Sequence, residues 1–254
     1  MKSVSLFLIV LALIAGCAKG PIWEGKIRVE VFDTPPPADV EHIYIKITEV
    51  SVQSPTAGWK TVAKPNITYD FLELINGTTA VLADTSLTPG YYTQMRLTVS
   101  DTNEVVVGGE SYPLVVPSGV ETGIKLNLDF DIGEGELIEI LIDFDASKSI
   151  IWTPGIYLLR PTFRAFKKIL SGTISGSVKD TTGMGIPNAL VKAISLNDTV
   201  STITNSTGSY KLILPAGIYD LGASAEDYTV ADTMYIGVEV QAGKDLINYD
   251  FVLE

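Results

Sequence analysis

The chain has 254 residues and a formal net charge of −12 at pH 7, from 18 Lys and Arg against 30 Asp and Glu. This balance excludes nucleic acid as an expected partner, because phosphate binding needs clustered Lys and Arg and the longest basic run is Lys167-Lys168. Hydrophobic residues make up 46% and charged residues 19%, which is typical of a packed globular protein and not of a disordered one.

The first sixteen residues have the features of a signal peptide. Lys2 supplies a positive start, and Leu6 to Ile14 form an apolar run that is too short to span a bilayer comfortably. The run ends in Ile14-Ala15-Gly16-Cys17, which resembles the lipobox of prokaryotic lipoproteins. The resemblance implies that residues 1–16 are removed, that Cys17 is lipidated, and that residues 17–24 form a tether. The alternative is an ordinary secretory signal with a chance cysteine.

Lipidation at Cys17 predicts a protein of the cell envelope whose contact with the membrane runs through its anchor. Cys17 is the only cysteine, so no internal disulfide competes for it. Two or more acyl chains give stable anchoring, since each buried methylene adds roughly 0.8 kcal/mol. Ala18 follows the cysteine, whereas an aspartate there commonly marks inner-membrane retention in Gram-negative lipoproteins. We therefore expect the outer membrane or the cell surface.

From Gly25 onward, polar and apolar residues alternate as in strands with one buried face. Lys26 to Phe32 predict the first such strand, which Asp33 to Pro37 end because proline cannot continue a ladder. A short helical turn is expected around Phe71 to Ile75. The other strands predicted before residue 168 are Ile43 to Val52, Thr79 to Ala83, Tyr91 to Ser100, Asn103 to Val107, Ile124 to Phe130, Leu137 to Phe144 and Tyr157 to Phe166.

After Ile169-Leu170 the strand pattern starts again. About seven strands in roughly 85 residues are the density of a β-sandwich. We therefore predict an all-β protein with two β-sandwich domains in series, residues 25–168 and 171–254. The strands predicted in the second are Gly172 to Val178, Leu190 to Ser195, Ser201 to Thr204, Ser209 to Leu214, Ile218 to Ala225, Met234 to Val240 and Asn248 to Leu253.

The second domain contains four motifs in order: Gly176 to Asp180, Gly185 to Val191, Thr204 to Tyr210 and Leu214 to Tyr219. These resemble the carboxypeptidase-regulatory-like domain over residues 172 to 254. The resemblance implies a seven-stranded sandwich related to transthyretin-type folds, without catalytic residues. In this reading Gly208 supplies a turn conformation that other residues resist.

Residues 25 to 166 are similar to domain of unknown function 4382. The motifs that carry this resemblance include Asp33-Thr34-Pro35-Pro36, Trp59, Leu87 to Leu97, Val116 to Gly119 and Leu141 to Ser149. Members are typically prokaryotic envelope lipoproteins. The resemblance therefore implies an envelope location and a β-rich fold, and it brings no known ligand.

Catalytic signatures are absent from the sequence. It contains one histidine, His42, and no Gly-x-Ser-x-Gly motif. A zinc site through Cys and His is not expected because Cys17 is assigned to lipidation. Gly183-Met184-Gly185 lacks the Lys of a phosphate loop. We therefore predict that the chain is not an enzyme and has no cofactor, with a hydrolase hidden in the first domain as an outlying alternative.

Two kinds of ligand chemistry stay open. Acidic residues cluster between Asp129 and Asp145, and calcium takes six to eight oxygen ligands, so we name Asp129, Asp131, Asp143 and Asp145 as candidate metal ligands. The alternative is a solvated acidic face. Trp59, Tyr91, Tyr92 and Trp152 lie near predicted loops and could stack on a glycan, although most large aromatic side chains belong to the core.

Arg96 and Lys125 stand inside otherwise apolar strands. They are compatible with an anion-binding pocket or with the exposed face of a half-solvated sheet. Taken together, the sequence predicts a lipid-anchored, non-enzymatic binding or adhesion protein of the cell envelope, with a glycan, calcium or an envelope protein as partner. A structural spacer or accessory subunit of an envelope assembly is the alternative.

Overall fold

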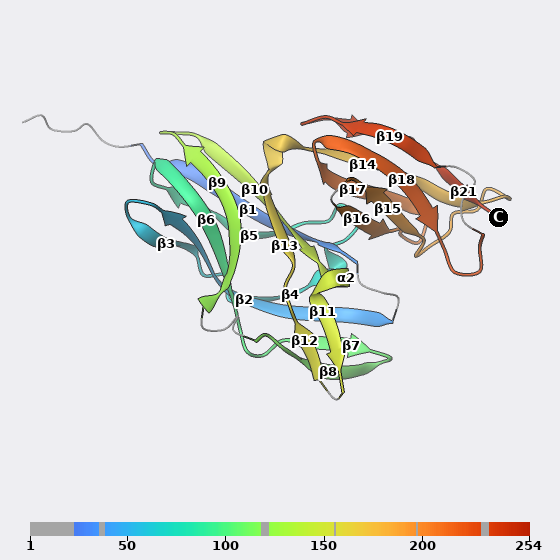
Figure 1. Ribbon diagram of the computed structural model, residues 1–254, viewed down its shortest axis with the longest axis horizontal. Helices are drawn as coiled ribbons and strands as arrows, with labels where there is room; N and C mark the ends of the chain where they lie inside the picture. The colour runs from blue at the N-terminus through green and yellow to red at the C-terminus, as the bar shows by residue number, and fades with distance from the viewer. Residues whose placement is uncertain (1–22, 36–38, 118–121, 155, 197, 230–233) are drawn as a thin grey trace, which may run out of the picture.

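The computed structural model describes residues 23–35, 39–117, 122–154, 156–196, 198–229 and 234–254. The predicted signal peptide and Cys17 lie outside these residues. The described part contains no helix with the length and apolar character needed to cross a membrane. As predicted, the protein is all-β, with two β-sandwich domains in series (Figure 1).

One sheet of the N-terminal sandwich has the strand order β13-β10-β1-β5. Strands β1 and β10 are parallel neighbours, with Val29 opposite Ile140. The alternation predicted for β1 holds, because Ile27, Val29 and Val31 are all fully buried. The four strands are β1 (Gly25–Thr34), β5 (Ala80–Leu87), β10 (Leu137–Asp145) and β13 (Phe163–Lys167).

The facing sheet has the order β11-β12-β8-β7-β2-β6-β9, and β3 and β4 also pair with β2. Strand β2 turns Ile43, Ile45 and Ile47 into the core. The strands are β2 (Val40–Ser54), β3 (Gly58–Ala63), β4 (Ile67–Asp70), β6 (Gly90–Val99), β7 (Glu104–Val107), β8 (Glu110–Val115), β9 (Ile124–Ile132), β11 (Ile150–Thr153) and β12 (Ile156–Leu159).

Two short helical segments complete the N-terminal sandwich. The turn predicted near Phe71 is the 3-10 helix η1 (Phe71–Glu73), and the carboxylate of Asp70 accepts a hydrogen bond from the amide of Leu72 at its start. The helix α2 (Ala146–Ser149) follows β10 and was not expected from the sequence. Its cap is Asp145, whose side chain accepts from the amide of Lys148, as capping residues commonly do.

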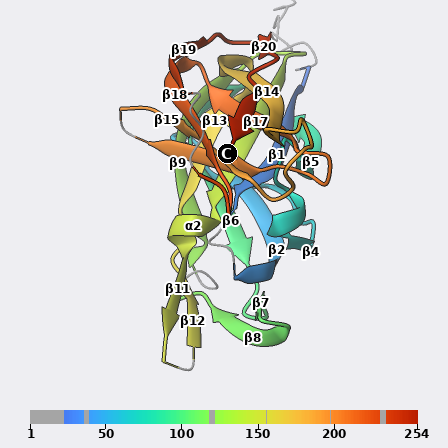
Figure 2. The same cartoon turned by 90° about the vertical axis from the view of Figure 1, so that its right-hand side faces the viewer.

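The prediction of one strand from Tyr157 to Phe166 is wrong, since the segment is split into β12 and β13 in different sheets. The chain leaves the ladder at Arg160 and Pro161, where proline removes a backbone donor. Strands β8, β11 and β12 form a projection, here called the arm, which extends away from the rest of the sandwich in both views (Figures 1 and 2).

The C-terminal sandwich pairs a sheet of order β17-β14-β20, in which β21 also joins β14, with a sheet of order β16-β15-β18-β19. Gly208 has a φ of +78°, and a Cβ there would lie 2.5 Å from the carbonyl oxygen of Val178, so the position requires glycine. The strands are β14 (Ser171–Asp180), β15 (Leu190–Ile194), β16 (Thr199–Ile203), β17 (Ser209–Pro215), β18 (Gly217–Ser224), β19 (Tyr235–Val240), β20 (Asp245–Leu246) and β21 (Phe251–Leu253).

The sandwiches are joined by η2 (Lys168–Leu170), and this connection is tied to the N-terminal sandwich. The ammonium group of Lys168 lies 3.1 Å from a carboxylate oxygen of Glu139 and 3.4 Å from one of Glu30. Both partners belong to the sheet that contains β1. The connection is therefore held against the sandwich that precedes it.

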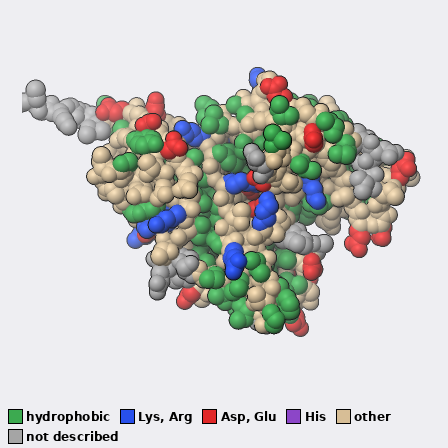
Figure 3. Space-filling model, in the orientation of Figure 1, with side chains coloured by type: hydrophobic (Ala, Val, Ile, Leu, Met, Phe, Trp, Pro, Cys, Tyr) green, Lys and Arg blue, Asp and Glu red, His purple; other side chains and the backbone are tan. Residues whose placement is uncertain are grey.

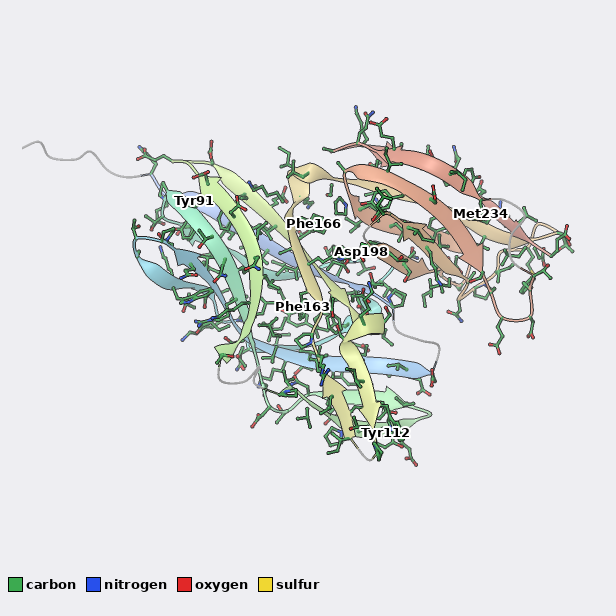
Figure 4. The ribbon with its side chains drawn as sticks, in the orientation of Figure 1. Tyr91, Tyr112, Phe163, Phe166, Asp198 and Met234 are labelled. Atoms are coloured by element: carbon green, nitrogen blue, oxygen red, sulfur yellow. The ribbon has the colours of Figure 1, made fainter. Side chains whose placement is uncertain are left out.

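A loop of the N-terminal sandwich also reaches into the C-terminal one. The side chain of Asn76 donates to the carbonyl of Ser209 (3.3 Å) and accepts from the amide of Lys211 (2.5 Å). The backbone amide of Asn76 donates to the hydroxyl of Thr202 at 2.9 Å. Asp198, labelled between the two sandwiches in Figure 4, forms ion pairs with Lys148 and Arg164. The two sandwiches are thus connected by side chains as well as by the chain.

Candidate ligand-binding site

An open groove of about 520 Å³ lies at one end of the N-terminal sandwich. It separates the tip of the β2–β3 hairpin from the turn that leads into β6. Tyr91, near the start of β6, is 45% exposed and lies at the left end of the molecule in Figure 4. The lining residues are Ser54, Pro55, Thr56, Ala57, Lys60, Thr88, Pro89, Gly90, Tyr91 and Tyr92.

Internal contacts hold the groove open in a fixed shape. The hydroxyl of Tyr92 donates to the carbonyl of Thr88 at 2.8 Å, and the ammonium of Lys60 donates to the hydroxyl of Thr88 at 2.7 Å. Gly90 has a φ of +152°, a backbone conformation that side chains disfavour. The turn is therefore preformed, as ligand pockets usually are.

Tyr91 and Tyr92 point to opposite sides of β6, since successive strand residues alternate. Tyr92 is buried, and its ring stacks on Phe130 with centroids 5.2 Å apart. Burial raises the pKa of the Tyr92 phenol. Of this pair of predicted ligand residues, the structure leaves Tyr91 facing the solvent and uses Tyr92 to support the groove from below.

Trp59 and Trp152 lie elsewhere. Trp59, on β3, is half-buried, and the guanidinium carbon of Arg96 lies 4.4 Å from its ring centroid. Trp152 lies on the arm, is 63% exposed, and is the cross-strand partner of Tyr157. The ring of Tyr157 packs on Tyr112, which Figure 4 places at the lower end of the molecule, far from Tyr91. The four predicted aromatic residues therefore do not form one platform.

A second, shallower hollow lies beside the arm. It has a volume of about 450 Å³ and is lined by Pro117, Leu158, Leu159, Arg160 and Pro161. The lining combines proline and leucine side chains with the charged Arg160 and offers no aromatic ring. This hollow therefore differs from the groove at Tyr91, which is lined by an exposed aromatic ring and several hydroxyl groups.

The four candidate calcium ligands are divided between the sheets. Asp143 and Asp145, on β10, are buried and are paired with Arg164 and Lys148, respectively. Asp129 and Asp131 are exposed on β9, which belongs to the facing sheet. Among the residues that the structure describes, no group of three or more His, Cys, Asp or Glu side chains could hold a metal ion. These four carboxylates therefore do not make one coordination site.

Asp33 is a buried carboxyl group that the sequence does not single out as a candidate ligand. Its Oδ1 accepts from the amide of Ala146 at 3.3 Å, and its Oδ2 has no partner among the described residues. Burial and the nearby charges of Asp143 and Asp145 raise the pKa of Asp33 well above its usual range. The register of β1 against β10 brings these side chains together, and this pairing is not visible in the sequence.

His42, the single histidine, is paired and not free. Its Nδ1 lies 2.5 Å from Oδ2 of Asp70, and its ring stacks on Tyr44 with centroids 5.4 Å apart. Nucleophilic catalysis needs a Ser, Thr or Cys within reach of such a base. No such side chain is hydrogen-bonded to His42 within the described part of the chain.

Fold and groove together define a two-domain β-sandwich protein with an open surface site. Residues 24–161 match the family described as Domain of unknown function (DUF4382), and residues 173–254 match the Carboxypeptidase regulatory-like domain. The first match spans more than half of the 254 residues, so the chain belongs to the DUF4382 family. Both resemblances drawn from the sequence motifs are confirmed. No curated protein matches the chain.

Solved structures give weak similarities. The Bacillus anthracis TIE protein is 18% identical with a TM-score of 0.30, and the match covers 91% of this chain but 34% of that one. A streptococcal ancillary pilin is 12% identical with a TM-score of 0.25, and the coverage is 90% and 62%. GBS52, a minor pilin of Streptococcus agalactiae, is 10% identical with a TM-score of 0.28, and the coverage is 89% and 96%. Such scores establish neither a shared fold nor a shared function.

Proposed function

We propose that this chain is a lipid-anchored, non-enzymatic binding or adhesion protein of the cell envelope, and that it binds a glycan in the groove at Tyr91. The observation that carries the proposal is an exposed aromatic ring beside a preformed, hydroxyl-lined groove. An aromatic ring offers an apolar face to a sugar. Ser54, Thr56, Lys60 and Thr88 supply the polar groups that fix orientation in such sites.

The lining of the groove favours binding over catalysis. Glycoside hydrolysis uses two carboxyl groups, one on each side of the bond that is cleaved. The residues that line the groove include no Asp, Glu or His, and Lys60 is their one charged side chain. A ligand held there would meet donors and acceptors without a general acid and base.

The start of β1 and the groove lie at the same end of the N-terminal sandwich. Gly25, at the start of β1, pairs with Leu87, which directly precedes the groove residue Thr88. From Cys17 to Gly25 there are eight peptide steps, which extend at most roughly 30 Å. With Cys17 lipidated, the groove would stay near the membrane surface, where a tethered site gains effective concentration for ligands of the envelope.

The test compares Tyr91→Ala with Tyr228→Ala, a matched control because Tyr228 is also exposed and lies in the other sandwich. The full-length protein is screened against envelope oligosaccharides by thermal shift, since a ligand that binds only the folded state raises the melting temperature. We expect Tyr91→Ala to weaken the affinity for the best ligand at least tenfold and Tyr228→Ala to leave it unchanged. Equal effects of the two substitutions would reject the groove as the site.

The contacts between the sandwiches favour a second function, that of a structural spacer or accessory subunit. Asn76 and Asp198 connect the sandwiches at two separate points, and Lys168 ties the connecting segment to the N-terminal sandwich, as expected of a rigid unit. A spacer requires no glycan. Absence of any oligosaccharide-induced shift, together with recovery of a single envelope protein after cross-linking in intact cells, would favour this function over the first.

A further inference from the structure

Arg96 is a guanidinium held in place without using its hydrogen bonds. It lies on β6, stacked over the ring of Trp59 at 4.4 Å. Its Nε is buried and has no hydrogen-bond partner, and none of its five N–H donors is hydrogen-bonded to a described residue. The nearest carboxylate oxygen, on Glu49, lies 4.0 Å away. An ordered guanidinium with free donors is suited to a planar anion, which it can bind through two parallel hydrogen bonds.

The backbone around Arg96 fits the side chain closely. Gly123 has a φ of +67°, and a Cβ there would lie 2.7 Å from the stem of Arg96. The aliphatic stem is therefore packed between Gly123 and the ring of Trp59. This packing fixes the guanidinium before any ligand arrives, which lowers the entropy lost on binding.

Basic side chains gather around Arg96, although the whole chain carries a net negative charge. Lys125 is the cross-strand partner of Arg96, and Figure 3 shows Lys and Arg side chains over the region of β3 and β6. Glu49 is the opposing charge, but it already accepts from Ser51 at 2.6 Å and lies 3.7 Å from Lys64. These contacts lower the pKa of Glu49 and compete with Arg96 for its oxygens.

A row of side chains crosses the sheet between Arg96 and the groove. Trp59, Gln53, Gln94 and Asn127 are successive cross-strand partners on β3, β2, β6 and β9, so they share the outer face of the sheet. The amide of Gln94 donates to Asn127 at 3.0 Å. Tyr91 and Arg96 are five residues apart on β6, or about 16 Å at 3.3 Å per residue.

We propose that Arg96 is the anion-recognising residue of the glycan site, and that the ligand is an oligosaccharide that carries carboxylate groups. The inference rests on the proposed function and adds the chemical class of the ligand. One sugar ring stacks on Tyr91, amides of the outer face bind hydroxyl groups, and a uronic acid carboxylate pairs with Arg96. The span between Tyr91 and Arg96 requires an oligosaccharide and not a single sugar.

The experiment measures dissociation constants of the full-length protein for two probes of equal length, an oligogalacturonate and a neutral oligogalactoside. The variants are Arg96→Gln, Arg96→Lys, and Lys192→Gln as a control, because Lys192 is an exposed lysine on β15 of the other sandwich. We expect Arg96→Gln to weaken oligogalacturonate binding at least tenfold and to leave oligogalactoside binding unchanged. Arg96→Lys keeps the positive charge but loses the planar guanidinium and its stacking on Trp59. We therefore expect it to weaken oligogalacturonate binding less than Arg96→Gln does.

The outcomes separate the two levels of the proposal. Equal affinity for both probes, or oligogalacturonate binding that Arg96→Gln does not change, would overturn the acidic ligand and leave the glycan groove standing. Absence of binding to either probe or to any other oligosaccharide would overturn both. Tighter binding of a polyglutamate peptide than of oligogalacturonate would replace the saccharide by an acidic protein segment. The melting temperature of each variant shows whether a loss of binding is caused by misfolding. If Arg96→Gln is misfolded, Arg96→Lys, which keeps the aliphatic stem, is the variant that tests the role of the guanidinium.

Discussion

Asp33 is a buried carboxyl group whose surroundings favour the protonated form. Its carboxyl group is buried between Asp143 and Asp145, and those two aspartates are already paired with Arg164 and Lys148. No described cation remains for Asp33, and its pKa is raised well above the usual range by burial and by the two carboxylates. The proton on Asp33 therefore removes a buried negative charge that would otherwise have no counter-charge.

Because the pKa of Asp33 is raised in the folded protein, this residue makes the free energy of unfolding fall as the pH rises. The folded protein binds this proton more tightly than the unfolded chain, so the stability contributed is fully present below the unfolded value, about 3.9, and is lost as the pH rises towards the folded pKa. Asp33→Asn cannot ionise. We expect the variant to be more stable than the wild type at pH 8, by roughly 1–3 kcal/mol, and nearly equal at pH 4.

Urea unfolding at pH 4, 6 and 8 checks this expectation. Asp129→Asn serves as the control, because Asp129 is exposed on β9 and its replacement should leave the curve unchanged. A variant Asp33→Asn that is less stable than the wild type at pH 8 would show that the charged carboxylate is needed there.

At the scale of elements, Asn76 takes the place of a missing strand. β17 is an outer strand of its sheet, and such strands expose unpaired amides and carbonyls to other chains. The side-chain amide of Asn76 binds both the carbonyl of Ser209 and the amide of Lys211, which is the pattern that a neighbouring strand would supply. The loop thereby protects this edge and joins the two sandwiches through the same groups.

Asn76→Ala should weaken this junction. Asn66→Ala is a matched control, because Asn66 has a φ of 51° and Asn76 a φ of 56°, so both substitutions place Ala in the same disfavoured backbone conformation. Two lost side-chain hydrogen bonds at roughly 0.5–1.5 kcal/mol each give an expected difference of about 1–3 kcal/mol between the variants. Hydrogen exchange at the amide of Lys211 should accelerate in Asn76→Ala alone. Unchanged protection of that amide would contradict the assignment.

Much of the element pattern follows from the sequence because one face of each strand is buried. Ile27, Val29 and Val31 on β1, like Ile43 and Ile45 on β2, are apolar at every second position, which is enough to predict the strands. The parallel pairing of β1 with β10 could not be predicted, since it joins positions more than 100 residues apart. The burial of Asp33 beside Asp143 depends entirely on that pairing.

The candidate site was predicted only in part for the same reason. Alternation implies that one of Tyr91 and Tyr92 faces inward, but which of them does so depends on the facing sheet. The stacking of Arg96 on Trp59 requires the registers of β3 against β2 and of β2 against β6. Neither register can be deduced from the local sequence, and both contain a bulge that shifts the pairing.

At the scale of the whole molecule, the anchor would place the two sandwiches differently. β1 begins at the end of the N-terminal sandwich that carries the groove, and the C-terminal sandwich lies at the opposite side of the molecule (Figure 1). A lipid on Cys17 would keep the groove close to the bilayer and direct the C-terminal sandwich outward. The groove and the C-terminal sandwich would then meet different surroundings.

Cys17→Ala tests the anchor on which this arrangement depends. Without the thiol no lipid can be attached, so we expect the variant to leave the membrane fraction, whereas the wild type remains there after a carbonate wash. Mass spectrometry of the wild type should show an acylated N-terminal cysteine. Ala18→Ser serves as the control. A Cys17→Ala variant that sediments with membranes as the wild type does would contradict lipid anchoring.

The position of Asn76 has one more consequence. Asn76, Gly77 and Thr78 spell the acceptor triplet for N-linked sugars. The nitrogen that would carry the sugar is the Nδ2 that donates to Ser209 across the junction. A sugar attached there would remove this hydrogen bond from the junction. In a cell with N-glycosylation, chains modified at this triplet would lose this contact between the sandwiches, and unmodified chains would keep it.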